Sequence, residues 1–200
     1  AIRSNIITDK DIDKEVNGLI TAICPDFLKN IDTQTGKYQS DIPLKIEAWK
    51  ADVLAELAYV LLKFKSMQNI CINIYDFLSK NGSNSLKGKV HLENLHSQKV
   101  LIDMERWLKD NAQPTHVIRQ KRIDAIIEAL QVLDRNMAGC ARLQDYDLIN
   151  ETSMIIFNTA IPLFKRSLRK HFYKAFYTAC DQLEQIESNE SLLRASMHYE

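Results

Sequence analysis

The chain has 200 residues, which is enough for one large domain or two small ones. It carries 26 Lys plus Arg and 26 Asp plus Glu, so its formal net charge is zero and no overall charge attracts nucleic acid or an anionic membrane. With 46% hydrophobic and 26% charged residues but only 5 Gly and 4 Pro, the composition excludes a disordered chain and argues against an all-β fold.

The four cysteines lie 40 or more residues apart and form no CxxC pair. This spacing predicts reduced, mostly buried thiols, as in a cytosolic protein, rather than a disulfide scaffold or a zinc site. The purely apolar runs are far shorter than the roughly 18 residues that a bilayer span needs. We therefore expect a cytoplasmic protein without a membrane segment.

Residues 1–41 are predicted to form an N-terminal helix and a loop. Apolar residues recur there at the three- and four-residue spacing of an amphipathic helix, which Pro25 interrupts. The following segment, 30–41, is polar and contains several turn residues, which indicates a loop. The apolar positions of the helix are Ile12, Val16, Leu19, Ile20 and Ile23.

Residues 42–82 are predicted to form the first helical hairpin. Asp41 is a candidate N-cap for a long first helix, and Trp49 is expected to anchor the core from the apolar stripe of that helix. Ser66 offers a cap for the second helix, which Gly82 is expected to close.

Residues 83–200 are predicted to continue as helical hairpins of the same solenoid, truncated at the C-terminus. A small, polar segment at 81–89 indicates a linker. A long helix is expected over 91–111, and Thr115 can cap the next one, which completes a second hairpin.

A third hairpin is predicted after Asp145 or Asp147, either of which can start its first helix. Pro162 lies inside this helical pattern and is expected to bend the helix near Asn158. The second helix of the hairpin follows Lys170. A last helical pattern still continues at the end of the chain, and we expect the sequence to be a segment of a longer polypeptide.

Seven to eight helices without a convincing strand predict an all-α fold. Successive antiparallel hairpins joined by short turns favour stacking into an α-solenoid, because such pairs bury their apolar faces only against neighbouring pairs. The alternative is one compact helical bundle.

Histidine and cysteine residues give no pattern of a catalytic or metal centre. His91 and His96 are five residues apart, whereas two zinc ligands on one helix face are four apart. The HExxH, phosphate-binding-loop and GxSxG motifs are absent, and no His has a neighbour at a spacing that suggests a nucleophile or a relay. We expect no enzymatic activity, no metal and no cofactor.

One basic segment is the best candidate for binding a partner. Clustered cations raise the local concentration of anions and could hold an acidic tail, although the same pattern is typical of a solvated turn between helices. The candidate partner-binding residues are Lys165, Arg166, Arg169, Lys170 and Lys174. The neighbouring aromatic residues are expected to pack between hairpins; they are Phe172, Tyr173, Phe176 and Tyr177.

The first hairpin resembles the tetratricopeptide pattern, in which a small residue lets two helices approach closely. Ala58 would be that small residue, and Gly82 stands where the pattern has Pro. The first-helix positions are Leu54, Leu57, Ala58 and Leu61, and the second-helix positions are Ile70, Ile74 and Phe77. In the third hairpin the corresponding residues are Ile156, Ala160 and Leu163 against Phe172, Phe176 and Ala179. Large residues replace small ones at several positions, so the resemblance is to an irregular, tetratricopeptide-like repeat.

Several phrases resemble the divergent helical repeats of large axonemal scaffold proteins, in particular the cilia- and flagella-associated protein 46 family of the central apparatus. They are NTAIPLF, SLRKHF, LEQIES and LLRASMHYE, and the resemblance covers most of residues 42–200. It implies a non-catalytic scaffold in the cytoskeleton of a cilium or flagellum, assembled on microtubules in a large complex with other axonemal proteins, with tubulin as a further candidate partner. It implies no cofactor.

The expected function is therefore protein–protein assembly through extended helical surfaces, without nucleic acid or membrane as a partner. A free-standing helical-repeat adaptor that binds a peptide, unrelated to cilia, is the main alternative. An all-α enzyme would need convergent polar residues that the sequence does not show. The balanced charge disfavours an RNA-reading helical repeat.

Overall fold

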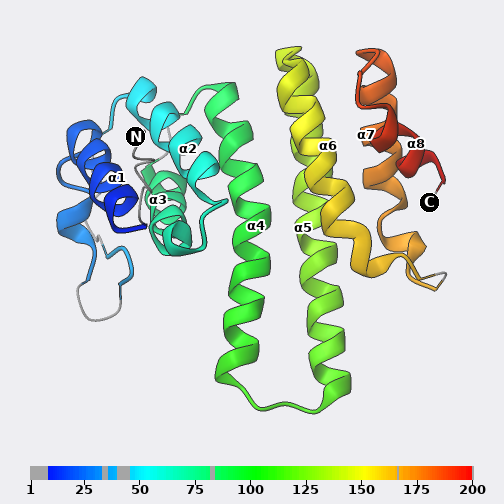
Figure 1. The fold of residues 1–200 in the computed structure, drawn as a ribbon, viewed down its shortest axis with the longest axis horizontal. Coiled ribbons are helices and arrows are strands. Elements are labelled where there is room, and N and C mark those ends of the chain that lie inside the picture. Colours follow the sequence, from blue (N-terminus) through cyan, green and yellow to red (C-terminus); the bar gives the residue numbers. More distant parts are fainter. Residues whose placement is uncertain (1–8, 33–35, 40–45, 82–83, 166, 200) are drawn as a thin grey trace, which may run out of the picture. The chain divides into compact units, whose positions relative to one another are not determined.

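A computed structural model describes residues 9–32, 36–39, 46–81, 84–165 and 167–199 (Figure 1). Over these residues the chain is all-helical: it has eight α-helices and no strand, with one isolated β-bridge between Ile31 and Tyr38. The α-helices are α1 (Asp9–Ile23), α2 (Ala48–Leu61), α3 (Gln68–Asn81), α4 (Leu86–Asp110), α5 (Thr115–Leu143), α6 (Tyr146–Ala160), α7 (Tyr173–Gln185) and α8 (Ser191–Tyr199). The predicted all-α class is confirmed.

In the described segments, four 3-10 helices follow or precede some of these α-helices: η1 (Leu28–Asn30), η2 (Lys65–Met67), η3 (Ile161–Leu163) and η4 (Arg169–His171). The chain forms two compact units, Ala1–Leu95 and His96–Glu200, and the division falls inside α4. The predicted caps Asp41 and Gly82 lie outside the described residues. No α-helix in the described ranges combines the length and the apolar character that crossing a bilayer requires.

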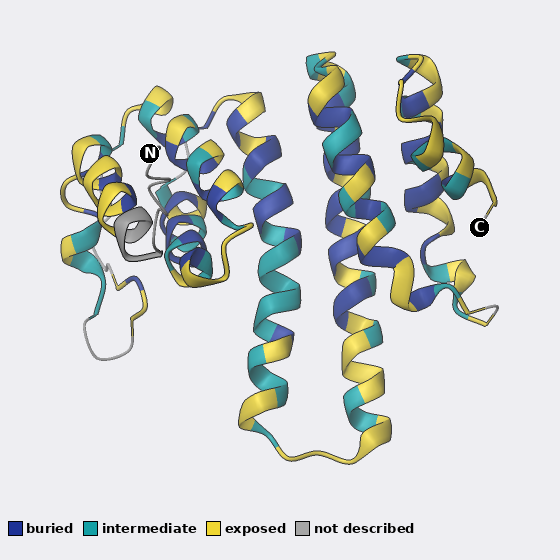
Figure 2. Cartoon of the chain, viewed as in Figure 1, coloured by how far each residue is buried: buried dark blue, intermediate teal, exposed yellow. Residues whose placement is uncertain are grey.

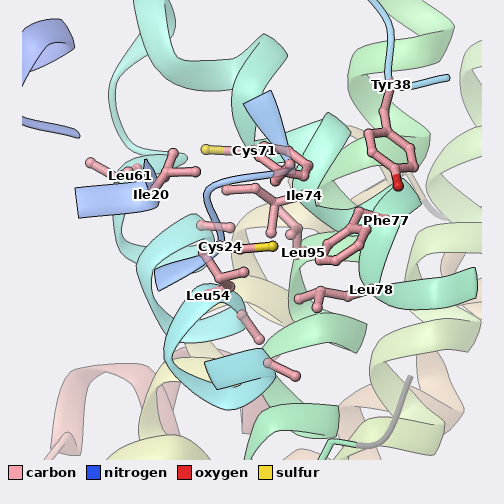
Figure 3. Packing of buried hydrophobic residues seen from close by; sticks show 14 of the residues in the cluster. Ile20, Cys24, Tyr38, Leu54, Leu61, Cys71, Ile74, Phe77, Leu78 and Leu95 are labelled. Carbon is pink, nitrogen blue, oxygen red and sulfur yellow. The ribbon is translucent and has the colours of Figure 1, made fainter. Parts of the chain in front are cut away.

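The first unit encloses a core built from α1, α2, α3 and the start of α4 (Figure 3). Leu54 and Ala58 of α2 are fully buried, as are Ile74 and Phe77 of α3. Helix α2 packs against α3, so the predicted hairpin pairing is observed. Complete burial of each large apolar side chain contributes about 1.5–3 kcal/mol.

Three aromatic rings form the centre of this core. The ring centroid of Phe77 lies 5.3 Å from that of Phe27 and 5.4 Å from that of Tyr38, and the Phe27 and Tyr38 rings are 5.5 Å apart. Tyr38 belongs to the irregular segment between α1 and α2, and the side chain of Asn73 fixes this segment to α3. The Asn73 amide oxygen accepts a hydrogen bond from the Tyr38 N–H at 3.1 Å, and its Nδ2 donates to the Gly36 carbonyl at 2.8 Å.

The start of α4 is capped by residues from two elements. Ser85 Oγ accepts a hydrogen bond from the Gly88 N–H at 3.2 Å, as an N-cap does. Asp52 Oδ1 of α2 accepts one from the Ser85 N–H at 2.9 Å. Two donors that a helix start leaves without helical partners are thereby satisfied. Helix α4 begins at Leu86, so the predicted linker at 81–89 is shorter than expected.

The second unit is built around α5, α6 and α7, which pack against one another, with α8 against α7. Asp145 caps α6 as predicted, because its Oδ1 accepts a hydrogen bond from the Leu148 N–H at 3.2 Å. Facing residues of α6, η3 and α7 bury the contact between these elements; they are Ile156, Ala160, Leu163, Phe172, Phe176 and Ala179.

Several predictions about single residues in these units are wrong. Thr115 does not cap α5: it is the first residue of that helix, whose N-cap position is held by Pro114 without a side-chain hydrogen bond. Trp49 does not anchor the core: it is 59% exposed, and its Nε1 donates a hydrogen bond to Glu47 Oε2 at 2.6 Å. Pro162 does not bend α6 near Asn158. The α-helix ends at Ala160 and the chain tightens into η3, in which the Phe164 N–H bonds to the Ile161 carbonyl at 3.2 Å. Proline lacks the N–H that a continuing α-helix needs, so the helix stops.

Candidate protein-binding groove

A groove of about 620 Å³ lies in the second unit between α7 and α8, with η4 at one end; we call it the α7–α8 groove. Its floor consists of buried apolar side chains. Phe172, Phe176 and Cys180 come from the start and one face of α7, and Met197 comes from α8. All four are buried. The volume falls within the range of about 300–1,000 Å³ that is usual for ligand sites.

Two exposed aromatic rings form the rim of this groove. Tyr173 is 69% exposed and Tyr177 is 64% exposed. Because they are four residues apart on α7, their rings stack one turn above the other, with centroids 6.4 Å apart. The prediction that they pack between hairpins is wrong for these two, whereas Phe172 and Phe176 are buried as expected. Exposed tyrosines beside an apolar floor are typical of protein-binding surfaces.

The two ends of the groove carry opposite charges. Arg169 and Lys170 of η4 line one part of it, and Asp181 and Glu184 of α7 line another. Burial, followed by the negative charge of Glu184, raises the pKa of the Cys180 thiol, which therefore stays protonated. The groove thus offers an apolar centre bordered by charged residues of both signs, of which Glu184 is paired with Arg194 of α8.

Helix α8 is held against α7 by polar contacts to one carboxylate. Arg194 Nε donates to Glu184 Oε1 at 3.0 Å, and Arg194 Nη2 pairs with Glu184 Oε2. His198 Nε2 lies 3.2 Å from Glu184 Oε1, and Arg194 Nη1 also donates to the Ser188 carbonyl at 2.9 Å. The hydrogen bonds from Arg194, and next from His198, lower the pKa of Glu184. This carboxylate therefore fixes the wall of the groove that α8 contributes.

The structure separates the five basic candidates that the sequence grouped together. Arg169 and Lys170 line the α7–α8 groove, whereas Lys165 lines a different groove. Arg166 lies outside the described residues. Lys174 is 84% exposed, but its Nζ pairs with Asp134 Oδ2 of α5 at 2.8 Å. The Thr178 hydroxyl donates to the other oxygen of the same carboxylate at 2.9 Å, so Lys174 helps to join α7 to α5.

Sequence reasoning missed the contribution of α8. Met197 and His198 complete the α7–α8 groove, yet they follow the basic segment by more than twenty residues. The one signal in the sequence was the helical spacing of apolar residues in the last segment, which predicts a helix with an apolar face. It does not show which neighbour that face packs on.

The histidine pair that the sequence singled out does not form a site. His91 is buried, with its ring 5.3 Å from the ring of Tyr59, whereas His96 lines a separate groove beside Lys99 and Asp103. Within the described ranges, no group of three or more His, Cys, Asp and Glu side chains could hold a metal ion.

The chain matches no model of a known protein family, and no solved structure matches it.

Proposed function

We propose that the chain is a non-catalytic scaffold segment that assembles with other proteins through its helical surfaces, and that the α7–α8 groove binds a peptide of a partner. The observation that carries this proposal is the pair of exposed, stacked rings of Tyr173 and Tyr177 beside a closed apolar floor. Aromatic residues at the edge of a desolvated pocket contribute most of the binding energy in many protein interfaces.

The finer fold proposed is a tetratricopeptide-like α-solenoid. Two features support it: Ala58 is fully buried where the pattern has its small residue, and α2 packs against α3 and α6 against α7. Stacked hairpins of this kind would continue in a longer chain and present extended surfaces to partners.

The proposed setting is a ciliary or flagellar axoneme, in the central-pair apparatus, as part of a large complex on microtubules. The sequence segments that resemble axonemal scaffold proteins, such as NTAIPLF and LLRASMHYE, support this setting. Other axonemal proteins are the proposed partners, and Arg169 and Lys170 at one end of the groove would suit an acidic partner such as a tubulin tail.

Co-sedimentation with microtubules tests the groove and the acidic partner together. Tyr177→Ser removes a rim ring and should weaken binding by about tenfold or more, since an aromatic anchor contributes about 2 kcal/mol. Tyr146→Ser is the matched control, because Tyr146 is also a solvent-exposed tyrosine, at 60%, but lies on α6 outside the groove. Equal binding of the two variants to microtubules would show that the α7–α8 groove is not the binding site.

A second pair of variants tests the positive charge that η4 contributes to the α7–α8 groove. Lys170→Glu should weaken binding to intact microtubules, and removal of the acidic tubulin tails by subtilisin should abolish the difference between Lys170→Glu and the unchanged protein. Arg135→Glu makes the same change of charge on α5, where Arg135 is exposed and lies away from the groove, and should have little effect. Failure of the unchanged protein to bind microtubules would exclude tubulin as the acidic partner.

A free-standing adaptor that binds a peptide, unrelated to cilia, is the second candidate. The location of the whole α7–α8 groove within one compact unit favours it, because binding would then need no neighbouring repeats. A tagged chain expressed in ciliated cells distinguishes the two: localisation along the axoneme favours the scaffold, and a diffuse signal without axonemal proteins in the purified complex favours the adaptor.

A further inference from the structure

A second groove of about 610 Å³ lies in the same unit, between α4 and α5 and against the end of α6; we call it the α4–α5 groove. Met104, Ile126 and Leu163 are buried in it, and Leu101 and Ile123 are half-buried. The second half of α4 is mostly of intermediate burial and the first turns of α5 are largely exposed (Figure 2). Apolar surface of both helices therefore remains accessible along this groove.

Three cations border the α4–α5 groove, against one carboxylate. Arg119 and Arg122 lie one turn apart on the face of α5 that also carries Ile123 and Ile126, and Lys165 follows η3. The carboxylate is Glu105, whose Oε1 is 4.0 Å from Arg122 Nη2. All three cations are exposed, and neither Arg119 nor Lys165 has an ion-pair partner among the described residues.

This excess of positive charge distinguishes the α4–α5 groove from two other grooves among the described residues of the unit. The α7–α8 groove has Arg169 and Lys170 against Asp181 and Glu184. The other groove lies along α4 and α5 too and shares Met104 with the α4–α5 groove, but it has more carboxylates than Lys and Arg; its charged residues are Lys99, Lys121, Asp103, Asp124 and Glu128. Of these three, the α4–α5 groove is the one with more Lys and Arg than carboxylates in its lining, and this balance suits an acidic ligand.

We propose that the α4–α5 groove binds an acidic amphipathic segment of a partner protein. The apolar residues of that segment would enter between α4 and α5, and its Asp or Glu side chains would pair with Arg119 and Lys165. Aliphatic side chains form the floor, and no aromatic ring of the described residues lines it. This favours a peptide over single-stranded nucleic acid, whose bases stack on aromatic side chains. The proposal does not depend on the α7–α8 groove.

The test uses fluorescence anisotropy with the whole chain and three labelled peptides of equal length. The first peptide repeats Leu at helical spacing with Glu at the exposed positions. The second has Lys in place of Glu, and the third has Ser in place of Leu. We expect the first peptide to bind and the other two to bind at least about tenfold more weakly, because the second lacks the negative charges and the third lacks the apolar side chains. Absence of binding by the first peptide up to about 1 mM would overturn the proposal.

Single charge reversals then locate the site. Arg119→Glu and Lys165→Glu should each raise the Kd of the acidic peptide about tenfold, whereas the control Arg135→Glu, which changes the charge of α5 equally outside the groove, should leave it within about twofold. An equal effect of all three variants would show attraction by charge alone and overturn the assignment to this groove. Tighter binding of a polyuridine probe than of the acidic peptide, lost in Arg119→Glu, would also overturn it in favour of nucleic acid. Circular dichroism verifies that each variant is folded.

Discussion

Gly88 lies where α4 closely approaches α2, so the geometry predicts that adding one methyl group there destabilises the first unit. A Cβ at this position would be 2.9 Å from Asp52 Cγ and 3.0 Å from Asn84 Nδ2, and closer still to Asp52 Oδ1. The Asp52 carboxylate would have to move, and its hydrogen bond to the Ser85 N–H would be lost. Gly18 of α1 is the matched control, because a Cβ there would meet nothing within 4 Å beyond the backbone of its own helix.

The expected effects of the two substitutions have opposite signs. Gly18→Ala should stabilise the first unit by about 0.5–1 kcal/mol, the usual gain of Ala over Gly in a helix. At Gly88 the same gain of Ala over Gly is opposed by two losses of stability: about 1–3 kcal/mol for overpacking and about 1 kcal/mol for the lost hydrogen bond between Asp52 and the Ser85 N–H. We therefore expect Gly88→Ala to destabilise the first unit by about 1–3 kcal/mol.

Urea denaturation of Trp107→Phe protein measures these differences, because the remaining indole, Trp49, belongs to the first unit. In an Asp52→Ala background, Gly88→Ala should lose most of its cost, since the obstructing carboxylate is gone. If Gly88→Ala stabilised the protein as much as Gly18→Ala does, with Asp52 present, the reasoning from close approach would be refuted.

Three further predictions concern the core, the attachment of α8 and the thiols. Phe77→Ala should destabilise the first unit by about 3–5 kcal/mol in urea denaturation, because it removes the ring that contacts both other core rings; a loss below about 1 kcal/mol would contradict this. Since the pKa of Glu184 is lowered in the folded protein, its stabilisation of α8 is present above the unfolded pKa of about 4.3 and is lost as the pH falls through the lower folded value. Limited proteolysis should therefore cut α8 faster in Glu184→Gln than in the unchanged protein at neutral pH, and this difference should vanish in acid. Burial raises the pKa of Cys71 to about 12, so iodoacetamide should alkylate it only as fast as the core opens; a rate typical of an exposed thiol would show that the core is not closed.

Two helix pairs, α2 with α3 and α6 with α7, and the Asp145 cap could be predicted from the sequence because they depend on residues close together in the chain. The spacing of apolar residues located α2, α3, α6 and α7, and the Asp145 cap was predicted and observed. On α2, apolar residues lie on more than one face, so their spacing did not distinguish the buried face, which carries Leu54 and Ala58, from the exposed face of Trp49. Trp49 was therefore wrongly assigned to the core.

The candidate site could be predicted only in part, because its members come from distant segments. Proximity in sequence grouped Lys165 with Lys174, but the first lines the α4–α5 groove and the second pairs with Asp134 of another helix. Only the folded arrangement of α5, α7 and α8 decides which charges are compensated and which remain available to a ligand.

The segment between Phe164 and Phe172 carries most of the basic candidates, and an aromatic ring stands at each of its ends. The centroids of these two rings lie 5.3 Å apart, and both rings also contact Phe176. Evolution could therefore vary the residues between the two rings, and with them the choice of partner, while selection on the scaffold acts mainly on the rings themselves. Related chains are expected to differ more between these two phenylalanines than at them.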